Sequence, residues 1–170
     1  MTTPLITAPA STSDSLTRSL EFSSRLAFIA APVLFAISLA LPAIEHTKNG
    51  WECAGIALGF LSGLPTEEYF QWLYYAYFNV TNLALIFLPL LAFTPLGRRG
   101  ALSVCWLAGA CVLHTYSWLG LAIFRSNFDD VKVGYYVWLL ATMTLFAACL
   151  LRVHAQRRRD AAAPLPPHAH

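Results

Sequence analysis

The sequence predicts an all-α polytopic membrane protein, a bundle of four transmembrane helices with a partly helical first outer loop. Two observations carry this prediction. Hydrophobic residues make up 57% of the 170 residues and charged residues only 12%, about half the charged fraction of ordinary soluble domains. Four apolar runs, near 26–44, 70–93, 101–124 and 133–153, are each long enough to cross a hydrocarbon core of about 30 Å.

The first apolar run, 26–44, contains no charged residue and spans about 28 Å as a helix. Residues 1–24 before it are rich in Ser and Thr and predict a disordered cytoplasmic tail, with a short helix near Asp14 to Arg25. A cleaved signal peptide is the alternative, because small residues near Ala43 follow the apolar core. The run is longer than the core of a usual signal peptide, so we expect a retained membrane span.

The connection over 45–69 contains an apolar segment, Cys53 to Leu64, that is too short to cross a membrane. Such a length predicts a re-entrant or interfacial helix. The second run begins with YFQWLYYAYF, and the fourth begins with Tyr135, Tyr136 and Trp138. Aromatic residues in these places are typical of the headgroup region of a membrane. Residues 155–170, with consecutive arginines followed by Pro and His, predict a second disordered tail.

Basic residues predict the orientation of the bundle, because Lys and Arg concentrate in cytoplasmic loops. Eight fall on one side of the predicted bundle and three on the other. The eight are Arg18, Arg25, Arg98, Arg99, Arg152 and Arg157–Arg159, and the three are Lys48, Arg125 and Lys132. We therefore expect a multi-pass protein of the bacterial inner membrane with both termini in the cytoplasm.

The four cysteines are scattered and include no C-x-x-C pair. A structural metal site needs paired ligands at short spacing, so the sequence predicts no metal site and no cofactor. Cys105, Cys111 and Cys149 lie in apolar runs and should pack as small hydrophobic residues, whereas Cys53 lies in a loop.

Polar residues inside the predicted spans are the main pointers to a ligand site. The span interiors contain no Asp, Glu, Lys or Arg, which argues against an ion pump or a proton-coupled carrier. His114 is the most informative, and no second histidine lies at its depth to complete a haem site. We expect a neutral imidazole hydrogen-bonded to Asn82 or Thr142, with contact to quinone or lipid as the alternative. The candidate ligand-binding residues are His114, Asn82, Asn79, Cys111 and Trp118.

Acidic and aromatic residues gather on the predicted outer side, and aromatic residues dominate interaction hot spots. They predict a surface for a protein partner. Its candidate residues are Trp51, Glu52, Glu67, Glu68, Trp72, Asp129 and Asp130. The sequence contains no motif of a catalytic nucleophile, metalloprotease or phosphate-binding loop. A net charge of +2 without a basic stripe argues against nucleic acid as a partner.

Three short segments carry a resemblance: Leu41-Pro42-Ala43, Gly50-Trp51-Glu52-Cys53 and Gly134-Tyr135-Tyr136-Val137-Trp138-Leu139. In this pattern the chain resembles small uncharacterised bacterial inner-membrane proteins with four helices, and the resemblance implies the architecture alone. In size and helix number the chain is also similar to the disulfide-forming quinone reductases and the vitamin K epoxide reductases. Both families depend on paired cysteines at the outer face, where this chain has Cys53 alone, so their mechanism does not carry over.

Taken together, these patterns predict a non-enzymatic integral membrane protein that contacts the lipid bilayer. We expect an accessory or assembly subunit, or a protective partner, of another envelope protein. One alternative is a small-molecule site for quinone, lipid or haem near His114. A further alternative is a homo-oligomeric channel with a weakly polar pore formed by Asn79, Asn82, Thr115 and Ser117.

Overall fold

The computed structural model describes residues 12–44, 48–62, 69–124 and 131–162. Helices account for 91% of these residues, which confirms the expected helical fold. The helices are α1 (Thr12–Ala40), α2 (Gly50–Ser62), α3 (Tyr69–Phe87), the 3-10 helix η1 (Leu88–Phe93), α4 (Arg98–Phe124) and α5 (Val133–Ala162). Four helical stretches are long and apolar enough to cross a membrane: Asp14–Ala40, Trp72–Phe93, Arg98–Phe124 and Val133–Ala162.

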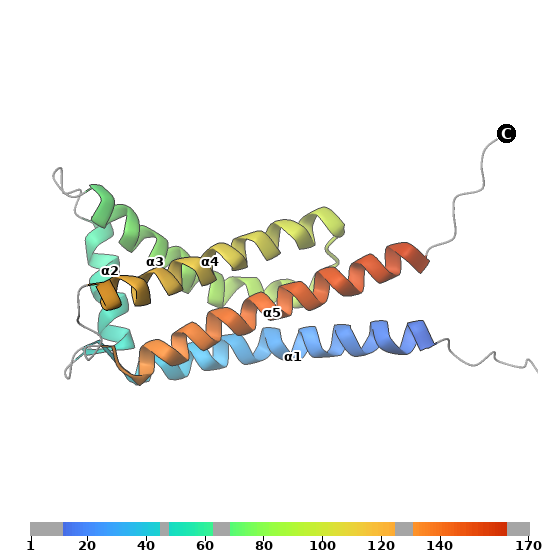
Figure 1. Ribbon diagram of the computed structural model, residues 1–170, viewed down its shortest axis with the longest axis horizontal. Coiled ribbons are helices and arrows are strands. Elements are labelled where there is room, and N and C mark those ends of the chain that lie inside the picture. The colour runs from blue at the N-terminus through green and yellow to red at the C-terminus, as the bar shows by residue number, and fades with distance from the viewer. Residues whose placement is uncertain (1–11, 45–47, 63–68, 125–130, 163–170) are drawn as a thin grey trace, which may run out of the picture.

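The four long stretches run along the molecule, and α2 crosses one of its ends (Figure 1). We call this the α2 end. The opposite end, the terminal end, holds the start of α1, the end of α5 and the turn between η1 and α4. Because each long helix reverses direction, the eight basic residues assigned to one predicted side all lie toward the terminal end, and Lys48 and Lys132 lie at the α2 end.

Helices α1 and α5 pack side by side and form the most extensive interface of the bundle (Figure 1). Phe28, Ala31 and Phe35 of α1 are buried in the core. The Ser24 hydroxyl donates a hydrogen bond of 2.9 Å to the Ala148 carbonyl of α5. This pairing makes α1 an integral part of the folded bundle.

Both helices extend beyond the predicted span boundaries. The short helix predicted near Asp14 to Arg25 is the start of α1, and residues 155–162, which were expected to belong to a disordered tail, are helical as the end of α5. An ion pair between Glu21 and Arg159 joins the two extensions, so the partner helix supplies the order that composition alone does not predict. The remaining residues of both predicted tails lie outside the described residues.

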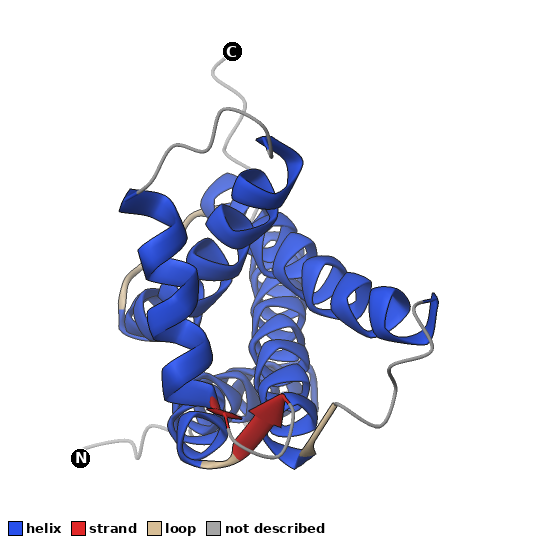
Figure 2. Ribbon diagram, turned by 90° about the vertical axis from the view of Figure 1, so that its left-hand side faces the viewer, coloured by secondary structure: helices blue, strands red, loops and turns tan. Residues whose placement is uncertain are grey.

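The first predicted span ends early, because α1 stops at Ala40 and Pro42 begins a short strand. Proline disfavours helix in the residue before it and has no N–H to donate. Strand β1 (Pro42–Ile44) pairs antiparallel with β2 (Lys48–Asn49), as Figure 2 shows. The Gly50 amide donates to the Leu41 carbonyl and the Lys132 amide donates to the Ala43 carbonyl, each at 3.0 Å. This turn therefore ties the end of α1 to the starts of α2 and α5.

Helix α2 is the short helix predicted in the first loop. Its 13 residues measure about 20 Å, too little to cross a membrane. Its first turn has a reciprocal cap: the Asn49 side chain accepts from the Glu52 amide at 2.9 Å, and the Glu52 carboxylate accepts from the Asn49 amide at 2.8 Å. Such a capping box satisfies N–H groups that an open helix end leaves unpaired.

Besides its apolar core, the bundle encloses several polar side chains, and many large apolar side chains lie on its surface. On α1, the exposed residues Leu26, Ile29, Val33 and Ile37 follow one another at helical spacing. The buried polar side chains are Ser24, Ser38, Asn79, Thr81, Asn82, His114, Thr115 and Thr142. This distribution is the one expected when the surrounding solvent is lipid.

Candidate binding cavity at the α2 end

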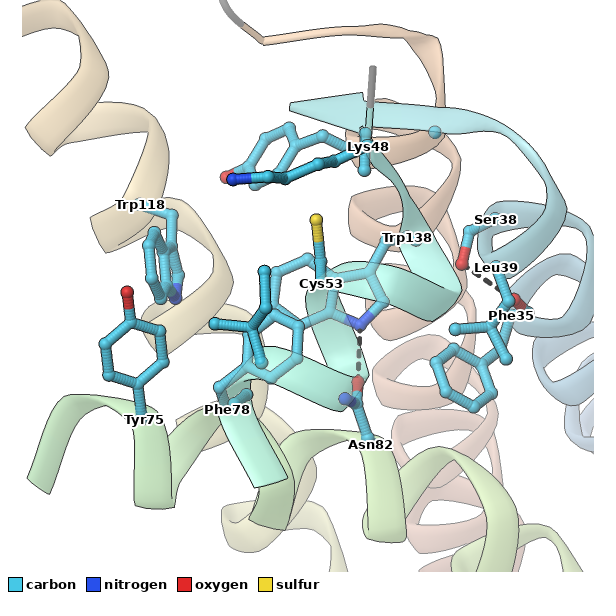
Figure 3. Close-up of a pocket in the computed structure, with 16 residues that line it drawn as sticks. Phe35, Ser38, Leu39, Lys48, Cys53, Tyr75, Phe78, Asn82, Trp118 and Trp138 are labelled. Carbon is cyan, nitrogen blue, oxygen red and sulfur yellow. Dashed lines mark hydrogen bonds between the residues drawn. The ribbon is translucent and has the colours of Figure 1, made fainter. Parts of the chain in front are cut away.

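A cavity of about 220 Å³ lies at the α2 end, enclosed by α2 and by the adjoining parts of the four long helices (Figure 3). Its lining is mostly apolar and rich in aromatic rings, with a small number of polar side chains, as in pockets for small ligands. The aromatic members are Phe35, Tyr75, Phe78, Trp118, Tyr135 and Trp138, and the polar members are Ser38, Lys48, Cys53 and Asn82.

Two glycines allow the segments around the cavity to approach one another closely. A Cβ atom on Gly50 would lie 2.8 Å from the Leu39 Cα atom. A Cβ atom on Gly134 would lie 2.7 Å from the Pro42 carbonyl oxygen. Real Cβ atoms do not come this close, so both positions require glycine. The three short segments that carry the resemblance therefore meet in space, and each contributes residues to the cavity lining.

One wall of the cavity is fixed by a hydrogen bond between α3 and α5. The Trp138 indole N–H donates to the Asn82 side-chain oxygen at 3.0 Å (Figure 3). Phe78 packs against Trp138, with ring centroids 4.9 Å apart. Within the described part of the chain, the Asn82 amide nitrogen has no hydrogen-bond partner, so it remains able to donate to a ligand.

Helix α4 contributes Trp118 to the lining, whereas His114 does not line the cavity. The Trp118 indole N–H donates to His114 Nε2 at 3.2 Å, so a neutral imidazole carries its proton on Nδ1. The rings of Tyr74 and Tyr77 pack on His114, with centroids 4.9 and 5.7 Å away. The predicted hydrogen bond from His114 to Asn82 or Thr142 is wrong, because Trp118 takes that place from one turn along the same helix.

The other predicted ligand-binding residues, Asn79 and Cys111, lie outside the cavity lining. The Asn79 amide donates to the Ala57 carbonyl of α2 and to the Tyr75 carbonyl, each at 3.0 Å. Asn79 thus joins α3 to α2 by a hydrogen bond. Cys111 is buried in the core, and its carbonyl accepts from the Thr115 hydroxyl. Of the five predicted residues, Asn82 and Trp118 line the cavity.

Lys48 and Cys53 complete the lining on the side of α2. Lys48 extends across the cavity from β2, and Cys53 projects toward it from α2 (Figure 3). The side chain of Cys53 is partly exposed, whereas Cys105, Cys111 and Cys149 are buried. This confirms the predicted division of the cysteines. Among the described residues, no three His, Cys, Asp or Glu side chains lie close enough to share a metal ion.

The predicted partner surface is described only in part. Trp51 is 70% exposed on α2, Glu52 is exposed but its carboxylate caps that helix, and Trp72 is partly buried. The remaining four predicted residues, Glu67, Glu68, Asp129 and Asp130, lie outside the described residues.

Several residues of the cavity were not predicted as a site. Tyr135 and Trp138 were predicted only to lie in the headgroup region, as aromatic residues at the start of an apolar run. Lys48 was named only as a basic residue of the predicted outer side. The signal that could have identified them is their place in or near the segments that carry the resemblance. Tyr135 and Trp138 lie within 134–139, and Lys48 lies two residues before 50–53.

Comparison of the chain with protein-family models, with curated proteins and with solved structures gives no match. The fold and the cavity geometry are therefore the basis for inferring function.

Proposed function

We propose that this is an integral membrane protein with four transmembrane helices and both termini on the cytoplasmic side of a bacterial inner membrane. Four long apolar helices, exposed apolar side chains and buried polar ones support insertion. The concentration of arginines at the terminal end supports the orientation. In this arrangement the α2 end faces outward, and α2 lies near the membrane surface.

We propose further that the protein binds a small, mostly apolar, ring-bearing molecule of the quinone class in the cavity at the α2 end. The observation that carries this proposal is an aromatic cavity with two hydrogen-bond donors at its wall and rim, the Asn82 amide and the Lys48 ammonium group. Donors of this kind match an acceptor oxygen on the ligand, such as a quinone carbonyl. Aromatic walls match a flat ring by offset stacking.

The geometry favours a quinone-class ring over haem. The cavity, at about 220 Å³, is smaller than the roughly 300–1,000 Å³ of sites for drug-sized ligands. His114, the residue near which the haem alternative was placed, accepts a hydrogen bond from Trp118 and does not line the cavity. A single ring system fits this volume better than a macrocycle does.

A titration of the purified full-length protein in mild detergent with a short-tailed benzoquinone tests the proposal. Trp118 and Trp138 line the cavity, so a bound quinone should quench their fluorescence. The quenching should reach a plateau when every cavity is occupied. Ala57 is buried against the cavity, and Ala57→Phe fills much of it. We expect roughly tenfold weaker binding for this variant, which corresponds to about 1.4 kcal/mol.

The matched control is Ala147→Phe, the same change at an exposed position of α5, which should bind as the unchanged protein does. Cys53→Phe fills the cavity from a position one turn earlier on α2 and serves if Ala57→Phe does not fold. If both filled variants fold and bind the quinone normally, the cavity is not the site.

A second candidate function, an accessory or assembly subunit or protective partner of another envelope protein, is favoured by the surface of α2. Trp51, Ile56 and Leu58 are 70%, 41% and 59% exposed on this helix, and exposed tryptophan is typical of interaction hot spots. Loss of a co-purifying protein on Trp51→Ala, with Leu113→Ala on the side of α4 as control, would support this function. Unchanged co-purification would argue against it.

The channel alternative is weaker. Asn79, Asn82 and Thr115, which were expected to line a pore between copies, are 7%, 9% and 0% exposed. They are enclosed within one chain, and Ser117 shares a hydrogen bond of 2.7 Å with the Tyr74 hydroxyl.

A further inference from the structure

A second cavity, of about 540 Å³, lies at the terminal end of the bundle. It is bounded by α1, by the segment that joins η1 to α4, and by α5. Four charged side chains line it: Glu21 and Arg25 from α1, and Arg152 and Arg159 from α5. Three guanidinium groups and one carboxylate give this lining a net charge of +2.

The single carboxylate is already paired. Glu21 forms an ion pair with Arg159. The Arg152 guanidinium donates to the carbonyls of Leu91 and Thr94, at the end of η1. These acceptors orient Arg152 but are neutral, and Glu21, the carboxylate that acts on Arg152 electrostatically, is already paired with Arg159. Among the described residues, no carboxylate lies within ion-pair distance of Arg25 or Arg152.

One carboxylate among three guanidinium groups leaves an excess of positive charge, and such a charge, partly withdrawn from water, is stabilised by a bound anion. Guanidinium groups bind phosphate oxygens with paired, charge-assisted hydrogen bonds. Helix α4 begins at Arg98, directly after the lining residue Gly97, and the N-terminus of a helix also favours an anion. The chemistry of the cavity therefore matches a phosphate group.

The position of the cavity indicates how a phosphate group reaches it. Arg25 directly precedes the exposed apolar residue Leu26 on α1, and Arg152 follows Leu150 and Leu151 on α5. Both arginines thus lie next to the apolar surface of their helix, near the point where charged residues begin to interrupt it; on α1 the exposed residues Phe22 and Leu16 lie on the other side of Arg25. In a membrane this is the level of the lipid headgroups, and basic pockets between helices on the cytoplasmic side bind anionic headgroups.

We propose that the cavity formed by Arg25, Arg152 and Arg159 binds the phosphate group of an anionic phospholipid. This site is separate from the cavity at the α2 end and does not depend on the function proposed for it.

Native mass spectrometry of the full-length protein in mild detergent, titrated with phosphatidylglycerol or phosphatidylcholine, tests the proposal. We expect one phosphatidylglycerol to be retained in preference to phosphatidylcholine. Arg25→Gln should weaken its retention roughly tenfold or more, because a charge-assisted hydrogen bond is lost. Arg25→Lys keeps the charge and should restore part of the binding.

The control is Arg99→Gln, which removes the same charge at the same end but outside the cavity lining, and it should retain the lipid. Arg25 is exposed and forms no ion pair within the described residues, so its substitution should leave the fold intact, as circular dichroism would verify. Equal losses in Arg25→Gln and Arg99→Gln, or equal retention of the two lipids, would overturn the proposal. Displacement of the lipid by millimolar inorganic phosphate would assign the site to a soluble phosphate and overturn its lipid part.

Discussion

At the scale of single residues, the cavity depends on side chains whose roles are set by partners distant in the sequence. Trp138 and Asn82 form one hydrogen bond across 56 positions, and Tyr135 donates to the Thr115 carbonyl of α4. Apolar periodicity cannot predict such pairs, because it indicates which face of a helix is buried but not which other helix packs against that face. This is why the sequence identified Asn82 as a polar residue of interest and assigned it the wrong partner.

Gly134 provides a direct test at this scale. We expect Gly134→Ala to lower the free energy of unfolding by about 1–3 kcal/mol, because its Cβ atom would meet backbone atoms of Leu41 and Pro42. Unfolding of the purified protein in detergent measures this loss. In contrast, Gly120→Ala in α4 should be tolerated, since its Cβ atom meets nothing within 4 Å. Equal stability of both variants would mean that α5 does not pack tightly on the end of α1.

At the scale of elements, the number and order of the long helices could be predicted because each apolar run is continuous and nearly free of charge. The boundaries could not. Helix α1 ends four residues before the predicted end of its span, where Pro42 redirects the chain, and it begins in a segment that pairs with α5. The short helix α2 was predicted three residues late, because its start is fixed by the cap formed by Asn49 and Glu52.

The cap predicts a local effect of Glu52→Ala. Loss of one side of a capping box costs about 1 kcal/mol, so hydrogen exchange of the first amides of α2 should become roughly fivefold faster, with little change in the long helices. Glu52→Gln, which can still accept from the Asn49 amide, should exchange nearly as the unchanged protein does. If the two variants exchange alike, the cap does not hold α2 in place.

At the scale of the whole molecule, the two ends of the bundle differ in chemistry. The α2 end encloses an aromatic cavity, and the terminal end encloses an arginine-rich one. The excess of basic residues at one end was predictable from the sequence, because it depends only on counting them between apolar runs. The cavities were not, because each is enclosed by residues from at least three separate segments.

The proposed orientation predicts how cysteines at the two ends react in intact cells. Trp51→Cys, at an exposed position of α2, should react with a membrane-impermeant maleimide, whereas Arg158→Cys on α5 should react only after the cells are opened. Both tests are made in a Cys53→Ser background, because the other native cysteines are buried. Reaction at Arg158→Cys alone in intact cells would reverse the orientation.

The most direct test of the central claim is photolabelling of the full-length protein in membranes with an azidobenzoquinone, followed by mapping of the labelled residues. If the cavity at the α2 end binds a quinone-class ring, labels should concentrate on its lining residues, foremost Trp118 and Trp138. An excess of unlabelled short-tailed benzoquinone should remove them. Labels confined to exposed apolar residues such as Trp106 and Phe124, unaffected by competition, would contradict the claim.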